Sequence, residues 1–268
     1  MTHSKKSRLR NVLICLGVVV LLSGCVTSSD SRFAREADED KAVRNYVQLA
    51  TAYIGQGNFD RARNHLERAL EIKPDSPSAL AAMGLIYQRE GDSQLARESF
   101  SKAVGNDGSY TRGRVYYGAF LYDQKEFEGA KEQFLKASAD TGYEDRGSVF
   151  FNLGRIYQRL GETGNAIDAF QRSVELSRGE PSALLALSTS LVQTDAYTEA
   201  SRYYSRLMTA MQRNRQMQHS PESLLTGIQI ARFFNEWDRE ASLALVLKNQ
   251  YPESDQYQQY KALISNDQ

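Results

Sequence analysis

Side chains able to carry out catalysis or bind a metal are few in this 268-residue chain. It has two cysteines, Cys15 and Cys25, and three histidines, His3, His65 and His219. Neither His65 nor His219 lies in a metal-binding pattern such as HExxH, and the GxSxG and GxxxxGK[ST] motifs of hydrolases and phosphate loops do not occur. We expect His65 to lie on the solvated face of a helix. The sequence therefore predicts a protein that is not an enzyme, with no cofactor, no metal and no small-molecule substrate.

Cys25 is the residue whose surroundings predict a covalent modification. A basic stretch is followed by an apolar run of 11 residues from Val12 to Leu22, which is too short for a spanning helix of about 20 residues. This pattern is typical of a secretory signal, although an ordinary signal peptide or a short membrane anchor would also fit. The ending Leu22-Ser23-Gly24-Cys25 resembles the bacterial lipobox. We expect residues 1–24 to be a lipoprotein signal peptide, and Cys25 to carry N-acyl (palmitate) and S-diacylglycerol chains.

The residues after the cysteine predict a compartment and a linker. Val26, in place of Asp, lacks the usual inner-membrane retention signal by resemblance to other lipoproteins, so we expect the periplasmic face of the outer membrane. The stretch from Thr27 to Asp40 is polar and charged, which is typical of a flexible tether. Residues 25–41 are therefore predicted to be a lipidated cysteine and its tether.

The charge balance excludes one class of partner. The whole chain has 33 basic and 33 acidic side chains. Four of the basic residues, Lys5, Lys6, Arg8 and Arg10, fall in the predicted signal peptide, so the remainder is acidic by four charges. Nucleic-acid binding needs clustered excess positive charge. We therefore predict no nucleic-acid partner.

The rest of the chain repeats with a period of 34 residues, as in Ala62, Ala96 and Ala130. Small residues recur at positions 8, 20 and 27 of each unit and large apolar ones at positions 4, 11 and 24, which lets two helices pack closely. The pattern resembles the tetratricopeptide signature. It predicts an all-α fold, a right-handed superhelical solenoid of about six repeats over residues 42–268. The units are 43–76, 77–110, 111–144, 147–180, 181–214 and 222–255, and residues 255–264 are predicted to form a C-terminal capping helix.

The inner groove of such a solenoid is the predicted binding surface. In tetratricopeptide arrays the first helix of each unit lines this groove, mainly through positions 2, 5, 9 and 12. The first two units place there the apolar or small residues Val47, Thr51, Ile54, Ala81 and Leu85. They either form a slot for a partner segment or are covered by the neighbouring unit or by the tether. A positive lining is predicted from Arg89, Arg112, Arg155 and Arg159.

The predicted mature chain resembles the type IV pilus pilotin lipoproteins, the PilF/PilW group. The resemblance rests on the lipobox and on three segments: YYGAFLYDQKEFEGAKEQFLKAS at 116–138, DTGYEDRGSVFFNLG at 140–154 and LLTGIQIAR at 224–232.

This resemblance implies a lipid-anchored protein of the outer membrane that binds secretin subunits of the type IV pilus and promotes their localisation and assembly into multimers. The alternative is a repeat-scaffold lipoprotein of the barrel-assembly machinery, or an adaptor for peptidoglycan enzymes.

Overall fold

The chain folds into a row of α-helices. The computed structural model describes residues 32–214 and 216–265, and across these residues there is no β-strand. Cys25, the predicted signal peptide 1–24 and residues 25–31 of the predicted tether lie outside the described residues. The helices are α2 Arg32–Gly55, α3 Phe59–Ile72, α4 Pro77–Glu90, α5 Ser93–Asn106, α6 Thr111–Asp123, α7 Phe127–Ser138, α8 Arg146–Leu160, α9 Thr163–Leu176, α10 Pro181–Gln193, α11 Tyr197–Arg213, α12 Pro221–Phe233, α13 Trp237–Gln250 and α14 Asp255–Ser265.

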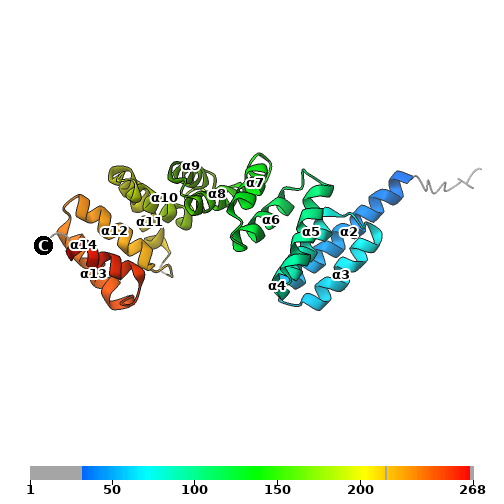
Figure 1. Cartoon of the computed structure of the whole chain (residues 1–268), viewed down its shortest axis with the longest axis horizontal. Helices are drawn as coiled ribbons and strands as arrows, with labels where there is room; N and C mark the ends of the chain where they lie inside the picture. The colour runs from blue at the N-terminus through cyan, green and yellow to red at the C-terminus, as the bar shows by residue number, and fades with distance from the viewer. Residues whose placement is uncertain (1–31, 215, 266–268) are drawn as a thin grey trace, which may run out of the picture.

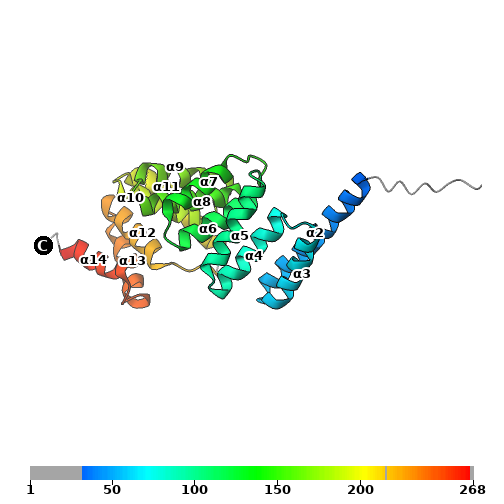
Figure 2. The ribbon, with the colours of Figure 1, turned by 45° about the vertical axis from the view of Figure 1, so that its right-hand side comes forward.

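The helices form six consecutive pairs, from α2 with α3 to α12 with α13, and α14 covers the end of the last pair. The pairs follow chain order along an elongated body, with the N-terminal helix and the C-terminus at opposite ends (Figures 1 and 2). The predicted all-α solenoid and its capping helix are confirmed. None of the helices described is both long and apolar enough to span a membrane.

Helix starts follow local chemistry. The side-chain oxygens of Ser76 and Ser220 accept hydrogen bonds from the backbone amides of Ala79 and Ser223, so both serines are N-caps. Each is followed by a proline at the first helical position, where the missing amide hydrogen has no intrahelical partner to lose.

In three units position 8 leaves no room for a side chain between the two helices of the pair. A Cβ atom built on Gly84, Gly118 or Gly154 would lie 2.8 Å or less from the ring of the phenylalanine at position 24 of the same unit. These rings belong to Phe100, Phe134 and Phe170, all fully buried or nearly so. In the first and last units a larger residue at position 8 goes with a smaller one at position 24: Ala50 with Leu66, and Ile228 with Ala244. The fifth unit does not follow this exchange, since it has Ser188 and Tyr204 at these positions.

A recurring left-handed turn corrects the register of the sixth unit. The residue at position 15 of each unit has positive φ between the two helices: Gly57, Gly91, Lys125, Gly161, Asp195 and Asn235. The last of these is at position 15 only if the sixth unit begins at Pro221, one residue before the predicted start at 222.

The burial pattern agrees with the corrected register. Ala241 and Leu245 stand at the packing positions 20 and 24 of a unit that begins at 222, but both are exposed, whereas Ala244 and Leu247 are buried. The position held by alanine in the other units is occupied by the buried Glu240, whose carboxylate pairs with Arg232 at 2.8 Å. A glutamate at an alanine position hid the true register from the sequence pattern.

The start of the repeat domain also differs from prediction. Residues 32–41, expected to belong to a flexible tether, form the first part of α2. This segment has no proline or glycine and is rich in good helix formers. Asp40 also pairs with Lys73 at the end of α3, and this hydrogen bond holds the pKa of Asp40 below its ordinary value.

Tyr204 joins the fifth and sixth units across the longer connection between them. Its side chain is fully buried, and its hydroxyl donates to the carbonyl oxygen of Ser223 at 2.9 Å. Burial raises the pKa of Tyr204 to about 12. A Cβ atom on Gly227 would lie 2.3 Å from this hydroxyl, so a glycine is needed where the tyrosine meets α12.

Cations at position 21 link the first four units. Arg63 pairs with Glu90 at 2.6 Å, Arg97 pairs with Glu126, and Lys131 reaches Glu162 at 3.0 Å. Each pair joins the second helix of one unit to the end of the next unit's first helix or the turn after it. The groups are partly exposed, so solvent screens the attraction and each pair mainly fixes the orientation of neighbouring units.

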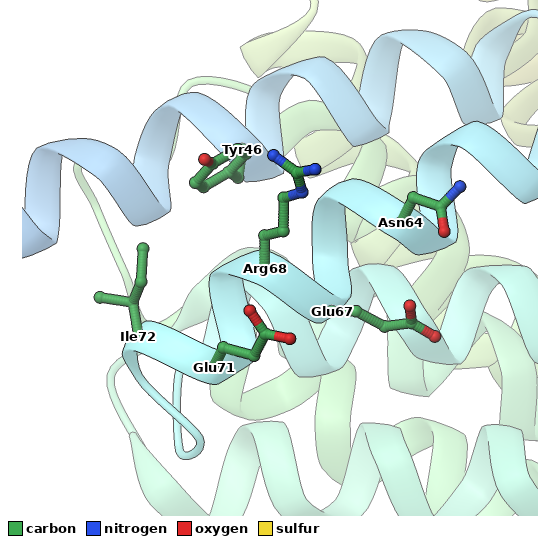
Figure 3. A pocket seen from close by; sticks show the side chains of 6 residues that line it. All are labelled: Tyr46, Asn64, Glu67, Arg68, Glu71 and Ile72. Atoms are coloured by element: carbon green, nitrogen blue, oxygen red, sulfur yellow. The ribbon is translucent and has the colours of Figure 1, made fainter.

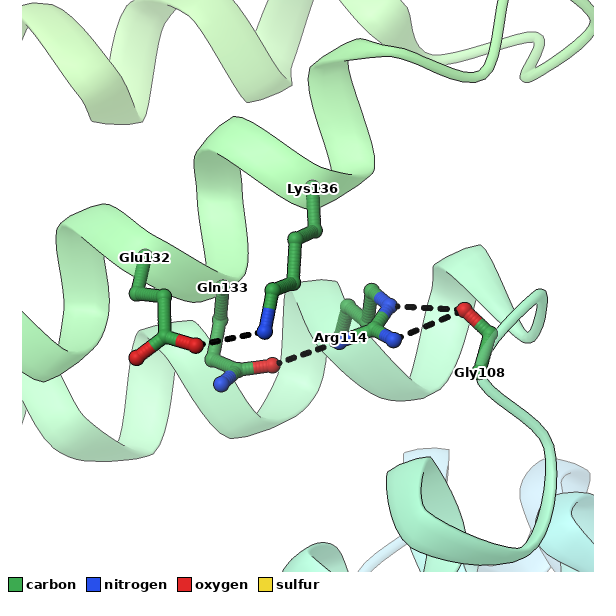
Figure 4. A network of polar contacts seen from close by, with 5 residues as sticks. All are labelled: Gly108, Arg114, Glu132, Gln133 and Lys136. Carbon is green, nitrogen blue, oxygen red and sulfur yellow. Dashed lines mark hydrogen bonds and ion pairs between the residues drawn. The ribbon is translucent and has the colours of Figure 1, made fainter.

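Arg114 fastens the loop between the second and third units (Figure 4). Its Nε and Nη2 donate to the carbonyl oxygen of Gly108 at 2.9 and 2.8 Å, and its Nη1 donates to Oε1 of Gln133 at 3.1 Å. On the same helix as Gln133, Lys136 pairs with Glu132 one turn away. One guanidinium thus connects a loop carbonyl to both helices of the third unit.

We predict that Gly154→Ala destabilises the protein by about 1–3 kcal/mol, because the new methyl group would overpack the buried ring of Phe170. Gly164→Ala in the same unit is the control, since a Cβ there has nothing within 4 Å. It should leave stability unchanged or raise it by up to about 1 kcal/mol. Urea denaturation followed by circular dichroism measures both. Equal midpoints for the two variants would contradict close contact at position 8.

Candidate functional site

The first helices of the pairs form the candidate binding surface. α2 contacts α4, α4 contacts α6, and α6 contacts α8, so these helices make one continuous row, and α10 and α12 contact each other in the same way. Because the row crosses unit boundaries, it presents side chains from several units to one partner. Such a surface suits an extended or helical polypeptide segment.

The predicted groove residues of the first two units differ in accessibility. Thr51 on α2 is exposed, and its hydroxyl donates to the carbonyl oxygen of Val47 at 2.8 Å. Val47 and Ile54 are half-buried against the core of the first unit, and Leu85 on α4 is half-buried against the cluster that contains Phe100. These four residues expose a mixed surface that is partly apolar and partly committed to packing.

Ala81 does not belong to this surface. It is fully buried, with an exposed fraction of 0%. α4 is flanked by α2 and α6, which both contact it, so a side chain as short as alanine is covered by its neighbours. The prediction that Ala81 lines the groove is therefore wrong.

Two of the four predicted arginines line a pocket farther along the row. Arg155 and Arg159 on α8, with Tyr122 on α6, border a cavity of about 370 Å³. The cavity is completed by Gln158, Thr163, Gln193 and Glu222. Its walls come from four consecutive units. Arg89 and Arg112 are exposed but do not line this cavity.

Tyr122 holds both arginines of this pocket. Nη2 of Arg155 and Nε of Arg159 each lie 3.2 Å from the tyrosine hydroxyl oxygen, which accepts both hydrogen bonds. The guanidinium carbon of Arg155 also lies 4.7 Å from the centre of the tyrosine ring, a cation–π distance. The hydrogen bond to Tyr122 raises the pKa of Arg159 above its ordinary value.

A second cavity, of about 670 Å³, lies between α2 and α3 at the N-terminal end (Figure 3). Its lining is mostly polar and charged, and the aromatic ring comes from Tyr46. Next to it His65 is half-buried, contrary to the predicted solvated face, because its ring stacks on Tyr53 at 5.5 Å and lies 6.0 Å from Tyr46. This histidine packs between two tyrosines of α2.

An exposed aromatic cluster lies outside the surface that the repeat pattern predicts. Tyr197 stacks on Phe233 at 4.4 Å, Phe234 lies edge-on to Phe233, and Trp237 is 61% exposed. These residues gather at the turns of the last two units. The pair of phenylalanines followed by tryptophan was the available signal, but it stands outside the repeat positions that organise the rest of the pattern.

Across the described residues no three histidine, cysteine or acidic side chains are grouped so as to hold a metal ion. The arrangement provides apolar surface, paired guanidiniums and hydrogen-bonding amides along one face. Groups of these kinds are able to bind a polypeptide segment.

Comparisons with known proteins agree with this architecture. Residues 47–111, 81–144 and 147–180 match tetratricopeptide repeat families. The chain is 36% identical over 246 residues to the type IV pilus assembly protein PilF of Pseudomonas aeruginosa, covering 91% of this chain and 95% of that protein.

Solved structures give the same result. A structure described as a functional characterisation of Pseudomonas aeruginosa PilF superposes with a TM-score of 0.75 at 36% identity, covering 84% of this chain and 99% of the other. PilW, described as a widely conserved type IV pilus biogenesis factor, superposes with a TM-score of 0.65 at 22% identity, covering 81% and 97%. At that identity, PilW shows the shared fold alone.

We predict that Ala81→Glu lowers the free energy of unfolding by about 3 kcal/mol or more, because a carboxylate would be buried without a partner. Thr51→Glu, at an exposed position of the same surface, should change stability by less than about 0.5 kcal/mol. Urea denaturation of both variants distinguishes a buried from an accessible position. If the two variants have similar stability, position 81 is accessible to solvent and Ala81 belongs to the groove surface after all.

Proposed function

We propose, from the premise that this chain belongs to the PilF family of type IV pilus tetratricopeptide-repeat proteins, that it is an outer-membrane pilotin. Its part in type IV pilus biogenesis follows from the family. In our proposal it binds secretin subunits, carries them to the outer membrane and promotes their assembly into multimers. The supporting observation is the 36% identity to PilF across 91% of the chain.

The proposed anchor is Cys25, at the periplasmic face of the outer membrane. Two or more acyl chains hold a protein on a bilayer durably, whereas a single chain binds only weakly. The repeat domain would then face the periplasm, where secretin subunits arrive. A subunit that is bound to an anchored scaffold is already held at the membrane and moves only in the plane of the bilayer.

The proposed contact surface is the groove of the first two units. Val47, Ile54 and Leu85 are half-buried, so each retains apolar surface for a partner. Full burial of such a side chain contributes about 1.5–3 kcal/mol before the costs of association. Thr51 lies exposed beside Val47 on the same helix, which makes it a position where a charge would oppose an apolar partner without disturbing the core.

We predict that Cys25→Ser yields a folded protein that is absent from the outer-membrane fraction, with secretin multimers reduced. Radiolabelled palmitate incorporation and membrane fractionation measure the first effect, and heat-stable secretin multimers on gels measure the second. As a control, Ser28→Ala leaves the cysteine intact and should incorporate label normally. Labelling of the serine variant, or normal multimers in a strain lacking the protein, would contradict the proposal.

We predict that Thr51→Glu lowers recovery of secretin subunits with the membrane-anchored protein about tenfold, equivalent to 1.4 kcal/mol. Glu98→Gln, at an exposed position on α5, the second helix of the second unit, is the control and should recover subunits normally. Co-purification of barrel-assembly components or peptidoglycan hydrolases in place of secretin would favour the alternative role as a different kind of scaffold.

A further inference from the structure

The pocket around Arg155 and Arg159 is separate from the groove of the first two units. Its lining residues come from α6, α8, α9, α10 and α12, in units three to six. A cavity of about 370 Å³ falls in the range of specific ligand sites. It is large enough to hold one or two residues of a bound chain.

The two arginines of this pocket differ from those that link the units. Arg63 and Arg97 each pair with a glutamate of the next unit. Among the described residues, no carboxylate lies within 4.0 Å of the guanidinium nitrogens of Arg155 or Arg159, and their hydrogen bonds go to the neutral hydroxyl of Tyr122. Two cations are thus held side by side, and among the described residues neither has an ion-pair partner within 4.0 Å.

Tyr122 leaves most of the donors available. Arginine has five N–H donors, and each of these guanidiniums uses one on the tyrosine hydroxyl. The stacked position of Arg155 on the ring limits its freedom before anything binds. Prearranged guanidiniums bind carboxylates through paired, charge-assisted hydrogen bonds.

The remaining lining is suited to a polypeptide. Gln158, Gln193 and Thr163 supply neutral hydrogen-bonding groups. Glu222 is the one acidic residue of the lining, and among the described residues it forms no ion pair within 4.0 Å with either arginine. It stands at the start of α12 and would repel a carboxylate that bound on its side of the pocket, so the preferred position is beside Tyr122.

We propose that this pocket binds a carboxylate of the protein partner, either the C-terminal carboxylate of its chain or an aspartate or glutamate side chain. The inference rests on the proposed function in one respect, namely that the inner surface receives a polypeptide. It adds a second recognition site in units three to six. This site would bind its partner by electrostatic attraction, whereas the groove of the first two units would bind by apolar contact.

The test uses the full chain in detergent and three unlabelled N-acetylated pentapeptides of alanine, glycine and phenylalanine. One has a free C-terminal carboxylate, the second is the C-terminal amide, and the third is the amide with one central glutamate. Ligand-observed NMR titrations measure binding. We expect saturable binding of at least one carboxylate peptide, about tenfold or more tighter than the uncharged amide. The first or third peptide identifies the source of the carboxylate.

The variants assign the binding to this pocket. Arg155→Gln with Arg159→Gln should weaken carboxylate binding about tenfold or more, and Glu222→Gln should strengthen it. Arg202→Gln with Arg213→Gln removes the same charge from exposed positions on α11 outside the pocket and should have no effect. Circular dichroism verifies that each variant is folded.

Equal binding of all three peptides, no saturable binding of any, or equal losses in the two double variants would overturn the carboxylate site. Recovery of secretin with the membrane-anchored wild-type protein tests the proposed function separately. If secretin is recovered but the protein does not prefer the carboxylate peptides, only the carboxylate-site proposal is contradicted. If the protein prefers the carboxylate peptides but does not recover secretin, the pilotin role is contradicted and the carboxylate site is supported.

Discussion

The architecture depends on how closely two helices can approach at position 8 of each unit. Three units place glycine there against a buried phenylalanine. The first unit pairs alanine with leucine, and the last exchanges the roles by placing Ile228 opposite Ala244. In these five units a larger residue at one position goes with a smaller one at the other, whereas the fifth unit has Ser188 and Tyr204 at the two positions. Since protein interiors are close-packed, this exchange fills the space between the two helices of a pair, and pairs packed in this way can stack into a solenoid.

Uniform packing leaves the inner row of first helices free to vary in chemistry. The first two units present the partly buried apolar side chains of Val47, Ile54 and Leu85. Units three to six form the pocket that Arg155, Arg159 and Tyr122 line. The ion pairs between units follow a similar division, because cations occupy position 21 in the first three units and are absent there in the fourth and fifth. One scaffold thus carries an apolar region and a cationic region in sequence along a single face.

Most of the fold could be predicted because the packing rule repeats at a fixed spacing. The helix pairs follow from residue types that recur every 34 positions, and the capping helix follows from the segment that remains after the last unit. The sixth unit was misplaced by one residue because Glu240, paired with Arg232, occupies an alanine position. Ala81 was assigned to the groove because position alone does not reveal how neighbouring helices cover a short side chain. Arg155 and Arg159 bond to Tyr122 in another unit, more than 30 residues away, and no pattern of neighbouring residues in the sequence predicts this contact.

The early start of α2 has a consequence for how far the body can travel. If Cys25 is held at the bilayer, only residues 26–31 separate it from a helix that begins at Arg32. Six residues extend at most about 20 Å, and the first eleven residues of α2 add a stiff arm of about 16 Å. The first unit would therefore stay within a short distance of the membrane surface. Within that distance its local concentration toward a membrane-proximal segment is high, while segments deeper in the periplasm stay out of range.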